Sequence, residues 1–172
     1  MPQSYVYTSK IIKAGALIAD TKTLLASWDL SRTVDENLDK FVSENIFGKA
    51  SRSRVEDILA IFRQRYLMEA PVIKALVTLV NHRFPAEALN CIFYFHAAQS
   101  DRLLHDVVTN LLTDLYYLGR QDISVNDVKA WIDKQIVQGK TQGTWSDSTL
   151  TRCAREILST LRDFGILKGG SS

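Results

Sequence analysis

The sequence predicts an all-α fold: a compact multi-helix protein with a helix-turn-helix element in its N-terminal part and a second one, winged or wingless, in its C-terminal part. Apolar residues recur at helical spacing along almost the whole chain, and strand-like alternation is nearly absent. Only three prolines and eight glycines interrupt the 172 residues. With 46% hydrophobic and 23% charged residues, the composition is typical of a globular protein and not of a disordered one.

The expected helices begin at residues that favour a first turn. These are polar side chains that cap free backbone N–H groups, and prolines, whose missing N–H costs nothing there. Glycines follow several of the helices, where a positive φ is often required. The helices are expected at 10–28, 34–46, 51–67, 71–82, 85–98, 101–118, 125–138 and 147–164. The start signals are Asp35, Ser51, Pro71, Pro85, Ser124 and either Ser146 or Ser148, and the stop signals are Gly48, Gly119 and Gly165.

Charge divides the chain into two mildly basic ends and an acidic middle. Residues 1–67 hold ten Lys and Arg against eight Asp and Glu, residues 68–119 three against five, and residues 120–172 eight against six. We expect an N-terminal helical helix-turn-helix region at 1–68, central core helices at 69–100, and a winged-helix-like region at 101–172. The closing segment "FGILKG" is the one candidate strand and would begin the wing.

The sequence argues against an enzyme, a bound cofactor and a metal. It contains no G-x-S-x-G, H-E-x-x-H, P-loop or dinucleotide-binding signature. The adjacent Glu56 and Asp57 point about 100° apart on a helix and form no obvious carboxylate pair. Cys91 and Cys153 fall in apolar helical contexts without a histidine at ligand spacing, so we interpret them as reduced core residues.

The most apolar stretch, residues 86–98, predicts a buried core helix. It spans only 13 residues and includes Asn90 and His96, whereas a membrane span needs about 20 apolar residues. The N-terminal residues contain no continuous apolar segment of the kind found in export signals. We therefore expect a cytoplasmic protein without a membrane association.

The stretch "ENIFGKASRSRVEDILAIFRQRYL", residues 44–67, has the pattern of a helix-turn-helix. Lys49, Arg52 and Arg54 surround the start of its second helix, where an acid would gain about 0.3 to 1 kcal/mol from the helix dipole and cations are unfavourable. Free N–H groups beside cations form a receptor for phosphate. The alternative is a chance cluster neutralised by Glu56 and Asp57.

The last helix, within "TWSDSTLTRCAREILSTLRDFGILKG", repeats the arrangement. Its apolar stripe comprises Leu150, Cys153, Ala154, Ile157, Leu158 and Leu161. The opposite side carries Ser148, Arg152, Arg155 and Ser159, with Thr144, Thr151 and Lys140 nearby. Hydroxyls and N–H groups position phosphates, and arginine contacts phosphates or guanine. The alternative is a merely solvated face, because most charged helical faces are only that.

Four segments resemble, in this order, the BrxA family of bacteriophage-exclusion (BREX) systems. They are "YTSKIIKAGALIADTKTLLASW", "ENIFGKASRSRVEDILAIFRQRY", "QSDRLLHDVVTNLLTDLYYLGRQDISVNDVKAWID" and "TWSDSTLTRCAREILSTLRDFGILKG". The resemblance implies a small, mostly helical DNA-binding protein that acts beside a methyltransferase, an ATPase and a phosphatase-like component in phage defence.

Together these observations predict a non-enzymatic protein that binds double-stranded DNA and supports host methylation and phage restriction. A protein-protein adaptor for larger BREX components and a helical RNA-binding protein are the alternatives. The acidic, aromatic-rich middle favours the adaptor, and the lack of a clear aromatic platform disfavours single-stranded RNA. The expected DNA-binding residues are Lys49, Arg52, Ser53, Arg54, Lys140, Thr144, Ser148, Thr151, Arg152 and Arg155.

Overall fold

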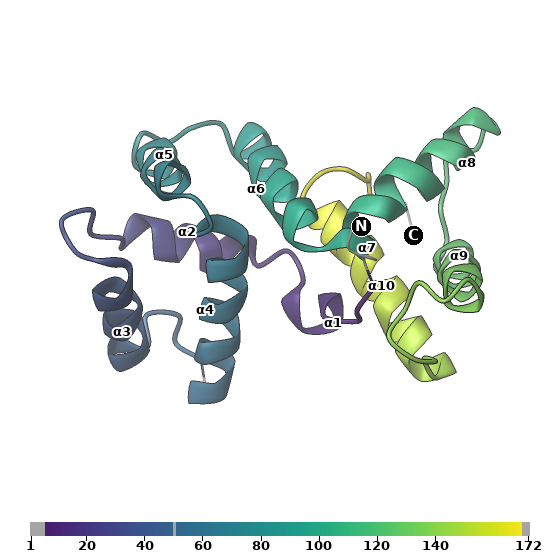
Figure 1. The fold of residues 1–172 in the computed structure, drawn as a ribbon. Helices are drawn as coiled ribbons and strands as arrows, with labels where there is room; N and C mark the ends of the chain where they lie inside the picture. The colour runs from purple at the N-terminus through teal and green to yellow at the C-terminus, as the bar shows by residue number, and fades with distance from the viewer. Residues whose placement is uncertain (1–5, 50, 170–172) are drawn as a thin grey trace.

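The computed structural model describes residues 6–49 and 51–169, and this part of the chain is helical (Figure 1). No strand occurs in these residues, where an isolated parallel bridge joins Tyr7 to Thr141. The all-α prediction is therefore confirmed for the described residues. The helices are α1 Ile11–Ala14, α2 Ile18–Ala26, α3 Val34–Glu44, α4 Arg52–Tyr66, α5 Ala70–Asn81, α6 Ala86–Ser100, α7 Arg102–Asp106, α8 Thr113–Tyr117, α9 Val125–Val137 and α10 Asp147–Asp163, and the π-helical segment Val107–Leu112 joins α7 to α8.

The single helix expected at 10–28 is wrong, because the chain forms two helices there. A turn separates α1 from α2, and in it Gly15 and Leu17 have φ values of 56° and 52°. The buried Arg65 of α4 donates hydrogen bonds to the carbonyls of Gly15 and Ala16, at 2.7 and 3.1 Å. Since these carbonyls have no partner within a helix, Arg65 stabilises the break.

Three helices, α4, α9 and α10, are capped by serines that the sequence predicted. Ser51, Ser124 and Ser146 each accept a hydrogen bond from the backbone N–H three residues later, at 3.2 Å. Thr33 caps α3, and Asp35 lies in the first turn of that helix, where its charge favours the dipole. These caps explain why the helices begin close to the predicted residues.

The expected helix at 101–118 is continuous but contains a π-helical segment. Asp101 caps its start by accepting from the N–H groups of Leu103 and Leu104. Within it, the Thr113 hydroxyl donates to the carbonyl of Val108, five residues earlier, at 3.2 Å. One extra residue in a turn widens the helix locally, which periodicity alone does not predict.

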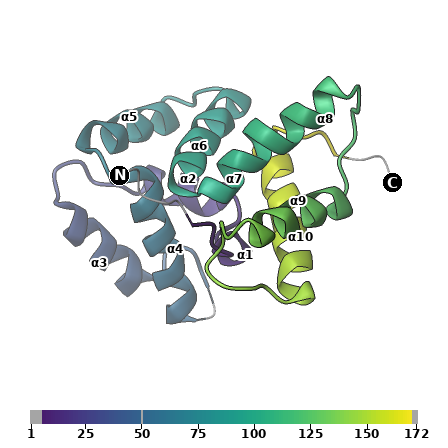
Figure 2. The ribbon, with the colours of Figure 1, turned by 45° about the vertical axis from the view of Figure 1, so that its right-hand side comes forward.

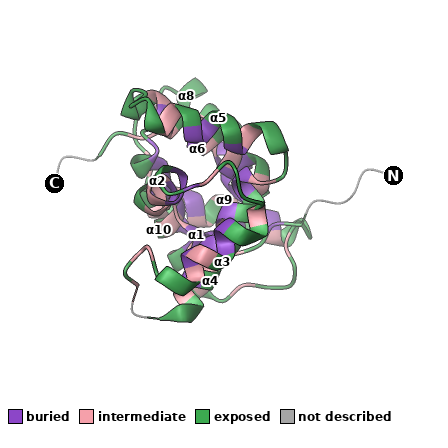
Figure 3. Cartoon of the chain, turned by 90° about the vertical axis from the view of Figure 1, so that its left-hand side faces the viewer, coloured by how far each residue is buried: buried purple, intermediate pink, exposed green. Residues whose placement is uncertain are grey.

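Aromatic rings form the centre of the N-terminal half. Trp28, Phe41, Phe62, Tyr66 and Phe93 come from the end of α2 and from α3, α4 and α6, and their successive centroids lie 5.2–5.8 Å apart. Such tilted pairs add to the free energy of burying the rings. Figure 3 shows the buried residues on the inward faces of the helices and the exposed ones outside.

The apolar stripe predicted for the last helix is buried in full. Leu150, Cys153, Ala154, Ile157, Leu158 and Leu161 have exposed fractions of 8% or less. They pack against α9 and α1, so α10 lies between the two in Figure 1. The structure therefore confirms which face of this helix is held by the core.

The first described residues also pack in the C-terminal half. The N–H of Tyr7 donates to the carbonyl of Lys140 at 2.7 Å, and its hydroxyl donates to Asp106 at 2.6 Å. The ring of Tyr7 lies 6.0 Å from that of Trp131 on α9. The start of the chain thus closes over α7, α9 and the loop before α10.

The expected wing has no strand in residues 165–169. α10 ends at Asp163, and Gly165, two residues later, has a φ of 79°. The N–H groups of Ile166 and Leu167 both donate to the carbonyl of Leu161. The backbone therefore folds back on the helix end as a turn. Residues 170–172, which could have extended the wing, lie outside the described residues.

The apolar stretch 86–98 lies within α6, which is amphipathic in the structure. Leu89 and Phe93 are buried, whereas Phe95 is 57% exposed. The expectation that Cys91 is a core residue is wrong, because Cys91 lies on the exposed face of α6. Among the described residues, no helix combines the length and the apolarity needed to cross a membrane.

Candidate nucleic-acid interface

The start of α4 is built by a tight turn and a serine cap. The side chain of Asn45 bridges the turn, accepting from the N–H of Lys49 at 3.1 Å and donating to its carbonyl at 2.8 Å. Ser51 then caps the helix, and Ser53 is exposed in its first turn. The turn and the helix start together place Lys49, Arg52 and Arg54 at one end of α4.

Each of the three cations at this helix start has a partner in the protein. Lys49 forms an ion pair with Asp20 of α2 at 3.1 Å, and Arg52 forms one with Glu56 at 2.9 Å. Arg54 donates to the carbonyl of Lys13, at 3.1 Å. Lys49 and Arg54 therefore help to join α4 to α1 and α2, and Glu56 neutralises Arg52 as the alternative interpretation predicted.

The start of α10 has a different local chemistry. The hydroxyl of Ser146 caps the helix and lies 3.0 Å from that of Ser148 and 2.9 Å from that of Thr149. Asp147, the acid of the first turn, forms an ion pair with Lys129 of α9 at 2.8 Å. Because Lys129 neutralises it, the negative charge of Asp147 opposes the binding of an anion at this helix start less than an unpaired acid would.

An exposed basic stripe runs along α10 opposite its buried face. Ser148, Arg152, Arg155, Ser159 and Arg162 are all exposed, and on a helical wheel they fall within about 80° of one another. Among the described residues, its three arginines have no hydrogen-bond or ion-pair partner. We call these five residues the α10 stripe.

Arg162 was missed in the sequence analysis, although the wheel that grouped Arg152 with Arg155 also includes it. Arg162 lies in the last turn of α10, far from the helix start where phosphate contacts were expected. Its neighbour Asp163 contributes a negative charge beside the stripe. Glu156, at the edge of the stripe, is a second acid there, and partial burial and then Asp163 raise its pKa.

The remaining predicted residues lie beside the stripe or in the loop before it. Thr151 is half-buried next to Ser148, and Thr144 is exposed two residues before the cap. Lys140 is exposed at the other end of the loop, where its ammonium donates to Gln135 at 3.0 Å and its carbonyl accepts from Tyr7. The structure therefore gathers Thr144 and Thr151 near the α10 start and ties Lys140 to α9 and the N-terminal segment.

The starts of α4 and α10 lie on the same side of the molecule. Figures 1 and 2, which differ by a 45° turn, both show the two helix starts at the lower edge of the molecule, with α1 between them. Exposed cations from two distant parts of the sequence thus face a common side.

The thiol of Cys153, beneath the α10 stripe, is fully buried, and burial raises its pKa to about 12, which disfavours the reactive thiolate. In the part of the chain that the structure describes, no group of three or more His, Cys, Asp or Glu could hold a metal ion.

Comparison with known families gives a match that covers nearly the whole chain. The model of the BrxA family matches residues 6–172. The chain belongs to the BrxA family. The resemblance seen in the four sequence segments is therefore confirmed, and the chain is a component of a BREX defence system. A search of curated proteins gives no match for this BrxA-family sequence.

Proposed function

We propose that this BrxA-family protein is a non-enzymatic double-stranded DNA-binding component of its BREX system, supporting host methylation and phage restriction. The observation that carries the proposal is the α10 stripe. Arg152, Arg155 and Arg162 keep all their donors available to an external anion, and arginine binds phosphate in bidentate geometry.

In this proposal, α9 with α10 and α3 with α4 act as helix-turn-helix elements, and α10 is the helix that faces the duplex. Arg152 and Arg155 contact phosphates, because they lie one to two turns inside the helix and not at its tip. The hydroxyls of Ser148, Thr144 and Thr151 add phosphate contacts. Lys49, Arg52, Ser53, Arg54 and Lys140 form the outer part of the interface and contact DNA more weakly, since their charged groups have partners in the protein.

A salt titration of binding to a generic duplex tests the proposal. Each neutralised phosphate contributes about −0.9 to the slope of log affinity against log salt concentration. Contacts from Arg152, Arg155 and one further cation therefore predict a slope of about −3 or steeper. A slope near zero would contradict DNA binding. Competition by duplex RNA of the same length at equal concentration distinguishes the RNA-binding alternative, because we expect DNA to compete better.

An adaptor role is the second candidate, favoured by exposed side chains at the end of α8. Tyr116, Tyr117 and Leu118 are 75–81% exposed at the tip of a helix that extends away from the rest of the molecule in Figure 1. Exposed aromatic residues in contact with one another are typical of protein interfaces. Binding of the purified methyltransferase, ATPase or phosphatase-like component, weakened by Tyr116→Ser with Tyr117→Ser, would support this role.

A further inference from the structure

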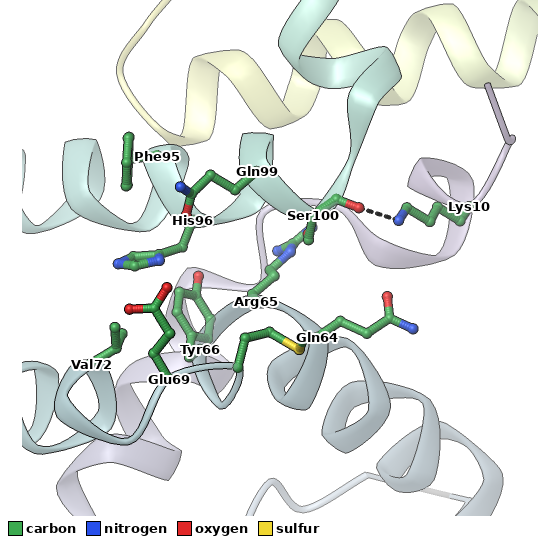
Figure 4. Close-up of a pocket in the computed structure, with 11 residues that line it drawn as sticks. Lys10, Gln64, Arg65, Tyr66, Glu69, Val72, Phe95, His96, Gln99 and Ser100 are labelled. Carbon is green, nitrogen blue, oxygen red and sulfur yellow. Dashed lines mark hydrogen bonds between the residues drawn. The ribbon is translucent and has the colours of Figure 1, made fainter. Parts of the chain in front are cut away.

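A cleft of about 750 Å³ opens between the end of α4, the start of α5 and the last turns of α6. Its size is within the range of small-molecule sites, which is about 300–1,000 Å³. Figure 4 shows side chains from these helices and Lys10 arranged around it. None of the predicted DNA-binding residues lines it, so it is separate from the α10 stripe and the α4 start.

The cleft contains a buried hydroxyl without a partner. Tyr66 is 1% exposed, and its ring packs on Phe62, Phe93 and His96. Its hydroxyl has no hydrogen-bond partner among the described residues, and Figure 4 shows the hydroxyl pointing into the space between α4 and α6. A buried polar group without a partner is unfavourable, and native proteins keep few of them outside binding sites.

Beside this hydroxyl lies a buried guanidinium whose charge interacts with the buried Asp101. Arg65 is 5% exposed and donates hydrogen bonds to the carbonyls of Gly15 and Ala16. Carbonyls satisfy two of the five N–H donors but do not neutralise the charge. Burial lowers the pKa of Arg65, which reflects the cost of taking its charge out of water.

A second cation stands at the same end of the cleft, and one buried acid faces both cations. Lys10 donates one hydrogen bond to the carbonyl of Ser100 and retains two N–H donors. The buried Asp101 does not line the cleft, but it lines a smaller adjoining cavity together with Lys10 and Arg65. Its single carboxyl stands against two cations, and burial raises its pKa. This end of the cleft therefore favours an anionic group.

The opposite end of the cleft is aromatic and carries one acid. The ring of Phe95 is 57% exposed and meets that of His96 edge to face, with centroids 5.3 Å apart. Burial lowers the pKa of His96, which favours the neutral imidazole. In Figure 4 the carboxylate of Glu69 points toward His96, where it can accept a hydrogen bond from an amino group.

We propose that this cleft binds a nucleoside monophosphate whose base carries an amino group. The phosphate lies against Lys10, Arg65 and the hydroxyl of Tyr66, and the planar base lies against Phe95 and His96 with its amino group on Glu69. A single ligand of this chemistry gives a partner to the unpaired hydroxyl of Tyr66, to the cations Lys10 and Arg65, and to the aromatic wall.

Calorimetric titration of the full chain with adenosine monophosphate tests the proposal, with inorganic phosphate, adenosine and inosine monophosphate as partial ligands. We expect saturable binding of adenosine monophosphate that is at least about ten-fold tighter than that of each partial ligand, since each lacks one group that the cleft contacts. Glu69→Gln should reduce the preference over inosine monophosphate, which lacks the amino group.

Tyr66→Phe is the decisive variant because it removes only the unpaired hydroxyl. It should melt at the same temperature as the parent or higher, and bind adenosine monophosphate about ten-fold more weakly. Tyr116→Phe, which removes an exposed hydroxyl far from the cleft, is the matched control and should leave binding unchanged.

Two results would overturn the proposal. One is the absence of saturable binding of adenosine monophosphate at millimolar concentrations. The other is binding that Tyr66→Phe leaves unchanged and that Arg152→Ala with Arg155→Ala abolishes, which would place the nucleotide on the α10 stripe. Loss of DNA binding alone in that double variant leaves the cleft proposal standing.

Discussion

The starts of α4 and α10 share a local signal, but their cations have different surroundings. Both helices begin at a serine cap and carry arginines near their starts, in the first turn of α4 and one to two turns inside α10. At α4, Lys49 and Arg54 bind groups of α2 and α1. At α10, Arg152 and Arg155 contact no described residue through a hydrogen bond or an ion pair.

This difference separates two origins of a basic helix start. At α4 the cations join helices, because the N-terminal half packs α1, α2 and α4 around the turn at Gly15. At α10 the apolar face is fully buried in the core, and the arginines of the opposite face contribute no contact to the fold. A basic cluster is therefore better evidence for an external anion when the protein itself supplies no partner for it.

The largest expected effect is on the α10 side of this comparison. Arg152→Ala with Arg155→Ala should reduce the salt slope of duplex binding by about 2 and the affinity at about 0.15 M salt roughly 30-fold, if affinity near 1 M salt is unchanged. Folding should be preserved because both side chains are exposed. The matched control is Arg32→Ala with Arg63→Ala, which removes the same charge from elsewhere. Equal losses in the two double variants would contradict a specific role for α10.

A smaller loss of affinity is expected at α4, accompanied by a loss of stability. Lys49→Ala, Arg52→Ala and Arg54→Ala together should weaken duplex binding only about 5-fold, as expected for one phosphate contact. The same variant should lose about 1 to 2 kcal/mol of unfolding free energy, because its ion pairs and the hydrogen bond to Lys13 are removed. Urea denaturation followed by circular dichroism measures this loss. A fully stable variant that binds DNA 30-fold more weakly would reverse the ranking of the two helix starts.

Removing the acid that pairs with a cation at α4 should raise the affinity for duplex DNA instead of lowering it. Asp20→Asn keeps the shape of the side chain and removes the charge that holds Lys49. If this pair withholds Lys49 from DNA, affinity should rise by up to about 5-fold and the slope should steepen by about 0.9. Asp35→Asn, which releases Arg63 instead, is the control. Identical gains in both variants would indicate a general charge effect.

The smallest expected effect is on stability, at the capping boxes that start α3 and α9, one in each half of the molecule. In α9, hydrogen bonds from Arg120 and then from Ser124 lower the pKa of Asp127, whereas in α3 hydrogen bonds from Thr33 lower the pKa of Glu36. A carboxyl whose pKa is lowered by folding contributes stability above its unfolded pKa, and this contribution is lost as the pH falls.

Asp127→Asn should therefore cost about 1 kcal/mol of unfolding free energy near neutral pH, and the difference from the parent should shrink as the pH falls below about 4. Urea denaturation at a series of pH values measures this trend. Glu36→Gln is the counterpart in the N-terminal half and should lose less, because no arginine holds its carboxylate. If the difference in unfolding free energy between Asp127→Asn and the parent grew as the pH fell, the prediction would be wrong.

The helices were predictable because their signals are local. Caps such as Ser51 and Ser146 act on N–H groups three residues away, and the buried stripe of α10 follows from spacing alone. The break between α1 and α2 was not predictable in this way. It depends on Arg65, fifty residues from Gly15, and no local pattern reveals that pairing.

In the candidate site too, features set by local sequence could be predicted, and features set by distant residues could not. The face of α10 that carries Arg152 and Arg155 could be inferred from the helical wheel, and its exposure is confirmed. The partners of Lys49 and Arg54 could not, because Asp20 and the carbonyl of Lys13 come from distant parts of the chain. Whether these faces bind DNA stays a prediction.

The bonds of Tyr7 have a consequence for the order in which a newly made chain folds. Its partners, Asp106 and the carbonyl of Lys140, leave the ribosome roughly 5 to 20 s and roughly 7 to 27 s after Tyr7, at synthesis rates of about 5 to 20 residues per second. The helices of the N-terminal half can associate during that interval, but Tyr7 must wait for its partners. The segment around Tyr7 therefore reaches its final place only after Asp106 and Lys140 have been made.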